Sequence, residues 1–165
     1  MLQADLFANL GIALGLGLIV GLQRESTSSE LAGVRTFPLV TLLGAVCALL
    51  AQPAGGWVLG AGLLGVAAAT AMGNAARLRG PEPDPGITTE VALLLMYALG
   101  AYVVTGNRVV AVVLAGTVAV LLHFKAELHG LVDRLGEGEL RAIMQFVLLA
   151  LVVLYFVGID QGANA

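Results

Sequence analysis

The chain has 165 residues, of which 59% are hydrophobic and only 12% are charged, and its mean hydropathy is +0.96. Soluble domains carry about 25% charged residues, so this chain has too few to cover the surface of a soluble fold. The composition excludes a soluble enzyme, a disulfide-rich secreted domain and a disordered chain, and eight basic residues form no patch for nucleic acid.

Six apolar blocks follow one another along the chain and predict an all-α, polytopic transmembrane bundle of about six helices. They cover residues 6–22, 37–51, 57–73, 89–105, 109–124 and 142–158. A span needs about 20 residues, so we expect the short second block to extend into 33–36 or 52–55. A re-entrant pair made by the second and third blocks is the alternative, because the connector 52–56 is tight. Asp5 stands where a signal peptide would have a basic residue, so the first block is expected to be a retained helix.

The positions of the charges predict the orientation of these helices. Seven of the eight basic residues follow the first, third and fifth blocks, and only Arg108 lies in an even-numbered loop. The positive-inside rule then places the odd loops in the cytoplasm and both termini outside.

Two of the cytoplasmic loops have a character of their own. Residues 80–85 contain three alternating prolines, so they form the best boundary between halves 1–79 and 86–158 of a single membrane domain, 1–165. Leu128, Leu131, Val132 and Leu135 have the spacing of an amphipathic helix, which predicts a short helix along the cytoplasmic membrane surface.

Small residues recur at four-residue spacing in two of the predicted helices. Such stripes let the backbones of two helices approach closely in lipid. Packing within the chain and a subunit interface are both open interpretations. The helix-packing candidates are Gly11, Gly15, Gly17 and Gly21 in the first helix, and Ala61, Gly65, Ala69 and Gly73 in the third.

A few polar residues lie at the edges of the apolar blocks, where each is a candidate for function. Asp5 and Asn9 are one helical turn apart and could form the mouth of a cation path, although Asp5 could equally be an interfacial acid near a helix start. Glu90 opens the fourth helix, where a favourable position in the helix dipole explains it equally well.

Metal ligands are suggested by two pairs spaced four residues apart. His123 with Glu127, and His129 with Asp133, could each share a helix face and chelate a metal ion. Lys125 lies four residues before His129, however, and the resulting ladder of mixed charges is typical of a solvated face. Cys47 is the single cysteine and is expected to behave as a small hydrophobic residue.

A charged cluster connects the first two helices. Arg24 and Arg35 can hold the acids Glu25 and Glu30, or they can anchor lipid headgroups. Gly33 adds a requirement for a close backbone approach or a left-handed turn. We expect these residues to form a cytoplasmic brace or gate.

This cluster resembles the signature of the MgtC/SapB family of membrane proteins. The residues that match it are Gly21, Leu22, Arg24, Glu25, Ala32, Gly33, Arg35 and Thr36. Residues 86–91, 129–132 and 139–142 are similar to a longer branch of the family, in which a second membrane domain of unassigned function follows. The resemblance extends to about Leu154, and the chain looks like half of the longer architecture. It implies a bacterial inner-membrane protein associated with magnesium homeostasis, which lacks the soluble C-terminal domain of classical MgtC.

These features favour one function over two others. The leading hypothesis is a homo-oligomeric carrier or channel, most simply a dimer, for a divalent cation such as magnesium, with Asp5, Asn9 and Glu90 on the ion path. The alternative is a non-transporting regulator that binds another membrane protein through a small-residue helix face. An intramembrane enzyme is not expected, because HExxH, GxSxG and paired mid-span aspartates are all missing from the sequence. Beyond a bound Mg²⁺, no cofactor is implied.

Overall fold

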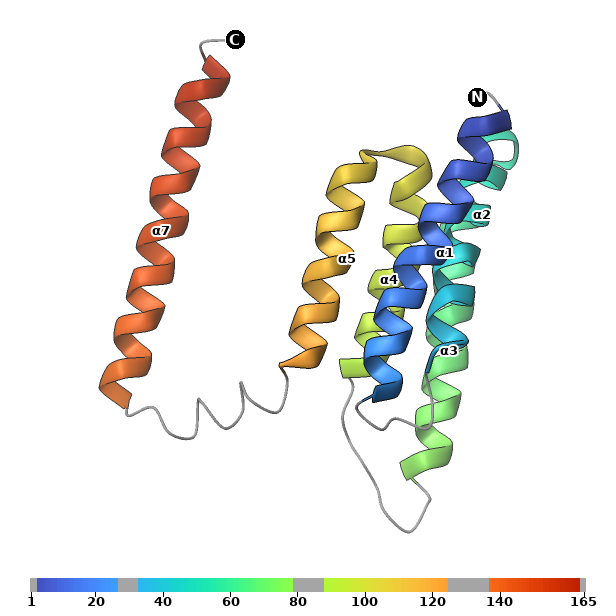
Figure 1. The fold of residues 1–165 in the computed structure, drawn as a ribbon, viewed down its shortest axis with the longest axis horizontal. Helices are drawn as coiled ribbons and strands as arrows, with labels where there is room; N and C mark the ends of the chain where they lie inside the picture. Colours follow the sequence, from blue (N-terminus) through green and yellow to red (C-terminus); the bar gives the residue numbers. More distant parts are fainter. Residues whose placement is uncertain (1–2, 27–32, 79–87, 125–136, 164–165) are drawn as a thin grey trace. The chain divides into compact units, whose positions relative to one another are not determined.

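The chain folds into α-helices throughout the part that the structure, a computed structural model, describes: residues 3–26, 33–78, 88–124 and 137–163. Within these ranges there are six helices and no strand (Figure 1). They are α1 (Gln3–Ser26), α2 (Thr36–Ala54), α3 (Trp57–Leu78), α4 (Thr88–Thr105), α5 (Arg108–His123) and α7 (Glu137–Ala163). The predicted all-α class is confirmed.

Helix α2 gains its length at its C-terminal end. It continues past Ala51 to Ala54 with Pro53 in its last turn, so the short apolar block extends into 52–55 as the sequence allowed. Gly55 then adopts a positive φ of 99°, which favours glycine, and its N–H donates to the Ala51 carbonyl at 2.9 Å. Helix α3 begins two residues later at Trp57. The lengths of α2 and α3 favour two full spans over a re-entrant pair.

Four of the helices, α1 to α4, are long and apolar enough to cross a membrane. Helix α5 has 16 residues, which corresponds to about 24 Å at 1.5 Å per residue and falls short of a hydrocarbon core of about 30 Å. In α7 the apolar stretch among the described side chains covers Arg141–Phe156. A count of six spans therefore stays a prediction for α5 and α7.

The chain divides into two compact units, Met1–His123 and Phe124–Ala165. The first contains α1 to α5, and the second contains α7. Helix α4 makes its most extensive contacts with α2, so helices from both sides of the loop 80–85 pack in one unit. The division into halves at that loop stays a prediction. The predicted surface helix at 128–135 lies outside the described residues.

The core of the first unit is apolar and tightly packed. Helix α2 contacts α1, α3 and α4, and α5 packs against α1 and α4. Phe37, Met96, Val20 and Val103 are fully buried between them. All charged side chains described in this unit lie near helix ends, while leucines and valines cover its outward faces, as expected for helices surrounded by lipid.

Glycines set the closest approaches between helices. A Cβ on Gly17 would lie 2.5 Å from Pro38 Cα, and one on Gly21 would lie 3.0 Å from Val34 Cα, so this pair packs α1 against α2. On α2 and α4, a Cβ on Gly44 would overlap the Tyr97 carbonyl. The Gly17–Gly21 pair therefore serves packing within the chain, which is one of the two interpretations that the sequence left open.

The other predicted stripes face away from the packed interior of the first unit. Gly11, Gly15 and Gly65 have no heavy atom of a neighbouring helix within 4 Å among the described residues. Ala61, Gly65 and Ala69 are exposed within this unit, and only Gly73 at the end of the stripe is half-buried. Packing inside the first unit does not explain these residues.

Candidate functional site

The signature residues gather at one end of the first unit, called here the Arg24 end. A terminal guanidinium nitrogen of Arg24, in the last turn of α1, donates to the Thr89 hydroxyl, in the first turn of α4. Thr89 is buried and Arg24 is half-buried. Two motifs that lie 65 residues apart in the sequence therefore meet in space.

Glu25 links the end of α1 to the turn that begins α2. Its Oε2 atom accepts a hydrogen bond from the Val34 N–H at 3.3 Å, and a Cβ on Gly33 would overlap that same oxygen. The Gly33 carbonyl accepts from the Thr36 N–H at 3.1 Å, which begins the helix. The carboxylate thus lies at the N-terminus of α2, where the helix dipole favours an acid. Gly33 has no positive φ, and the group that lies against it is the Glu25 side chain rather than a neighbouring backbone.

The remaining members of the predicted brace are placed less tightly. Arg35 is exposed at the N-cap of α2, and its side chain makes no cap hydrogen bond. Glu30 lies outside the described residues. The close contacts at this end thus come from Gly21, Arg24, Glu25 and Gly33, which connect α1 to α2 and α4.

The opposite end, called here the Asp5 end, holds a second polar cluster. Asp5 and Asn9 lie on α1, as predicted, and both contact Arg108, the first residue of α5. The Arg108 Nε donates to Asn9 Oδ1 at 2.7 Å, and a terminal nitrogen donates to Asp5 Oδ1 at 3.2 Å. Asn9 is 1% exposed, whereas the Asp5 and Arg108 side chains are 45% and 42% exposed.

Sequence reasoning assigned no role to Arg108. The signal that marks it is its position as the single basic residue of an even-numbered loop, because a charge against the positive-inside pattern needs a partner. The preceding Asn107 caps α5, since its Oδ1 accepts from the N–H groups of Val109 at 2.9 Å and Val110 at 3.3 Å.

The two ends are too far apart to share one ion site. Asp5 and Arg24 are separated along α1 by about 28 Å at 1.5 Å per residue, and Glu90 follows directly after the Thr89 that contacts Arg24. Glu90 is half-buried in the first turn of α4. The structure therefore brings Asp5 and Asn9 together with Arg108, and it places Glu90 at the other end.

The predicted metal pairs fall largely outside the described residues. His123 is exposed at the end of α5, but Glu127, His129 and Asp133 belong to the range that is not described. In the described ranges, no three His, Cys, Asp or Glu side chains come together as metal ligands. Metal binding by these pairs stays a prediction.

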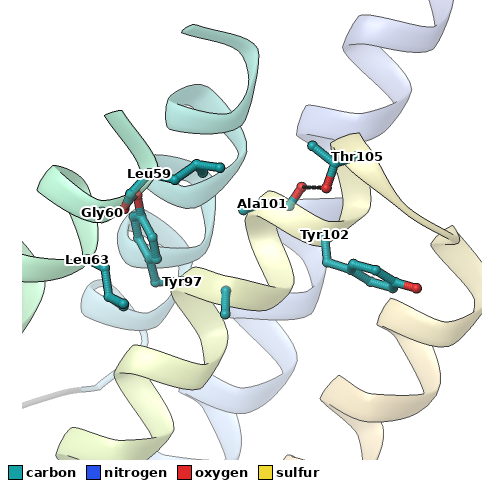
Figure 2. Close-up of a pocket in the computed structure, with 8 residues that line it drawn as sticks. Leu59, Gly60, Leu63, Tyr97, Ala101, Tyr102 and Thr105 are labelled. Atoms are coloured by element: carbon teal, nitrogen blue, oxygen red, sulfur yellow. Dashed lines mark hydrogen bonds between the residues drawn. The ribbon is translucent and has the colours of Figure 1, made fainter. Parts of the chain in front are cut away.

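A groove of about 300 Å³ runs between α3 and α4 (Figure 2). The Tyr97 hydroxyl donates to the Leu59 carbonyl at 2.9 Å, and the Thr105 hydroxyl donates to the Ala101 carbonyl at 3.1 Å. The lining contains no charged side chain, so it offers a metal ion no carboxylate. The residues that line it are Leu59, Gly60, Leu63, Tyr97, Ala98, Ala101, Tyr102 and Thr105.

Comparison with known proteins identifies a family for most of the chain. The model of the MgtC family matches residues 10–131. That range includes the whole Arg24 end and Arg108, begins just after Asn9 and ends before α7. No curated protein and no solved structure matches the chain significantly.

Proposed function

Because the chain belongs to the MgtC family, whose members are membrane proteins of magnesium transport or homeostasis, we propose that it moves magnesium across the bacterial inner membrane as a homo-oligomeric carrier or channel. A dimer is the simplest such assembly. The helices cross the membrane several times, with the Arg24 end in the cytoplasm and the Asp5 end outside. Seven of the eight basic residues lie in the loops after the first, third and fifth apolar blocks, which supports this orientation.

The observation that carries the oligomeric form of the proposal is the contrast between the glycine stripes. Gly17 and Gly21 pack α1 against α2. Gly11, Gly15 and Gly65, by contrast, have no heavy atom of a neighbouring helix within 4 Å among the described residues. The interior of that unit is filled by apolar side chains. Because that interior gives a hydrated ion no polar route, the ion path runs at the interface between copies, beside the contacts that the small residues make.

Few protein ligands are needed for this ion. Magnesium keeps several of its waters and is usually held by one or two carboxylates. Asp5 and Asn9 supply oxygen ligands at the Asp5 end, and Glu90 supplies one at the Arg24 end. The contacts of Arg24 and Glu25 brace α1 against α4 and α2, which makes the Arg24 end a cytoplasmic gate.

Flux measurements with matched variants test the proposal. Purified protein in liposomes is expected to admit Mg²⁺, and Gly65→Leu is expected to reduce both flux and dimer content. Gly116→Leu on α5, another exposed glycine with open space around it, is the control for the added bulk. Equal effects of the two substitutions would remove the α3 stripe from the interface.

A regulator that does not transport ions is the second candidate. The apolar interior of the first unit and the apolar lining of the α3–α4 groove favour it, because neither offers polar groups to a hydrated ion. In this case, Gly65→Leu abolishes co-purification of a membrane-protein partner and leaves cellular magnesium content unchanged. A fall in magnesium content without loss of a partner would instead support transport.

A further inference from the structure

The polar cluster at the Asp5 end has a buried side and an open side. Asn9 is 1% exposed, while Asp5 and Arg108 each leave almost half of their side chain in contact with the surroundings. Two different nitrogens of one guanidinium reach the two α1 residues, at 2.7 Å and 3.2 Å. The buried Asn9 side chain therefore fixes the cluster within the bundle, while Asp5 and Arg108 remain accessible at the surface of the first unit.

The two oxygens that Arg108 contacts are suitable ligands for a divalent cation. Carboxylate and amide carbonyl oxygens are both used by Mg²⁺ and Ca²⁺, and water fills the remaining positions. Arg108 places a single positive charge beside both oxygens. Because an ion pair this exposed contributes little to stability, a compact ion of twice the charge can compete for Asp5.

Displacement of Arg108 would act directly on α5. Arg108 is the first residue of that helix, and it makes two hydrogen bonds to α1 at this end. Further along, α5 packs through small buried side chains such as Ala111 and Ala115. With 16 residues, it is the shortest helix of the first unit. Its first turns are thus the part of the unit that depends most on the Arg108 contacts.

We propose that Asp5, Asn9 and Arg108 form a cation-responsive clasp: a divalent cation binds Asp5 and Asn9, displaces the Arg108 guanidinium and releases the start of α5 from α1. The inference rests on the proposed magnesium function and concerns its regulation from the Asp5 end. Arg108 is a positioning residue in this device, since it holds α5 only while the cation site is empty.

Hydrogen–deuterium exchange of the whole purified protein in nanodiscs tests the clasp. Millimolar MgCl₂ is expected to raise exchange in the first two turns of α5 by about fivefold, the size expected from losing an exposed ion pair. NaCl at the same ionic strength is the reference, because salt screening alone weakens such pairs. An equal rise with NaCl, or no rise with MgCl₂, would overturn the proposal.

Variants separate the clasp from the transport function. Asp5→Asn is expected to abolish the response to MgCl₂, and Arg108→Gln is expected to leave α5 in fast exchange without cation. Arg108→Lys keeps the charge but has one nitrogen in place of the two that contact α1, so it is expected to restore part of the response. Arg141→Gln, which removes an equal charge from α7, should respond as the wild type does. A response that persists in Asp5→Asn refutes the clasp, whatever the flux assay finds. A wild type that shows the response but no flux refutes transport and leaves the clasp standing.

Discussion

The contact between α2 and α4 predicts that Gly100→Ala destabilises the protein, whereas the same substitution at Gly116, an exposed glycine of α5, does not. A Cβ on Gly100 would overlap the carbonyl oxygen of Thr41, and a Cβ on Gly44 would overlap that of Tyr97, so each glycine lies against the backbone of the other helix. A backbone carbonyl in the middle of a helix cannot move aside as a flexible side chain can. Gly100→Ala must therefore push α2 and α4 apart.

The magnitude follows from comparison with Gly116, which is exposed on α5 with no neighbouring heavy atom within 4 Å. Replacing a helical glycine by alanine stabilises by about 0.4–1 kcal/mol where there is space, because the unfolded chain loses conformational freedom. This gain is common to both variants and cancels between them. What remains for Gly100→Ala is the cost of overpacking, about 1–3 kcal/mol.

The single, buried cysteine provides the assay. Cys47 lies on α2 and is 7% exposed, so a fluorogenic maleimide reacts with it only when the fold opens. The melting temperature of Gly100→Ala should fall below that of Gly116→Ala by about 2–12 °C, at 2–4 °C per kcal/mol. Equal melting temperatures would refute the proposed α2–α4 contact.

Two further predictions concern the Arg24 end. Gly33→Ala displaces only the Glu25 side chain, so we expect it to destabilise the protein by about 1 kcal/mol, as Glu25→Gln does. The double variant should lose no more stability than either single variant. Additive losses in the same thiol assay would show that the two residues act independently. Thr89→Val removes the hydroxyl that accepts from Arg24, and it should lower the free energy of unfolding by about 1–3 kcal/mol because a partly buried charge loses a partner. Thr89→Ser keeps the hydroxyl and should retain near wild-type stability. Equal losses of stability in the two variants would contradict the contact.

The helices could be predicted from the sequence because apolar block length determines them. The sequence marked Gly33 as a constrained position, but it did not show that the Glu25 side chain is the group lying against it. The partner of Asp5 was not, because Arg108 follows it by 103 residues and only folding brings α5 beside α1. The two Gly-xxx-Gly pairs of α1 look alike in sequence, yet only Gly17 and Gly21 face α2. Which face a stripe presents depends on how the helices pack.

Magnesium entry into sealed proteoliposomes, followed with an internal Mg²⁺-sensitive dye, tests the central claim most directly. We expect vesicles that contain the wild-type protein to fill faster than empty vesicles, and Asp5→Asn to slow that filling because the outer oxygen site loses its charge. If wild-type vesicles fill no faster than empty ones, while vesicles with a known magnesium channel fill under the same conditions, the protein does not transport magnesium.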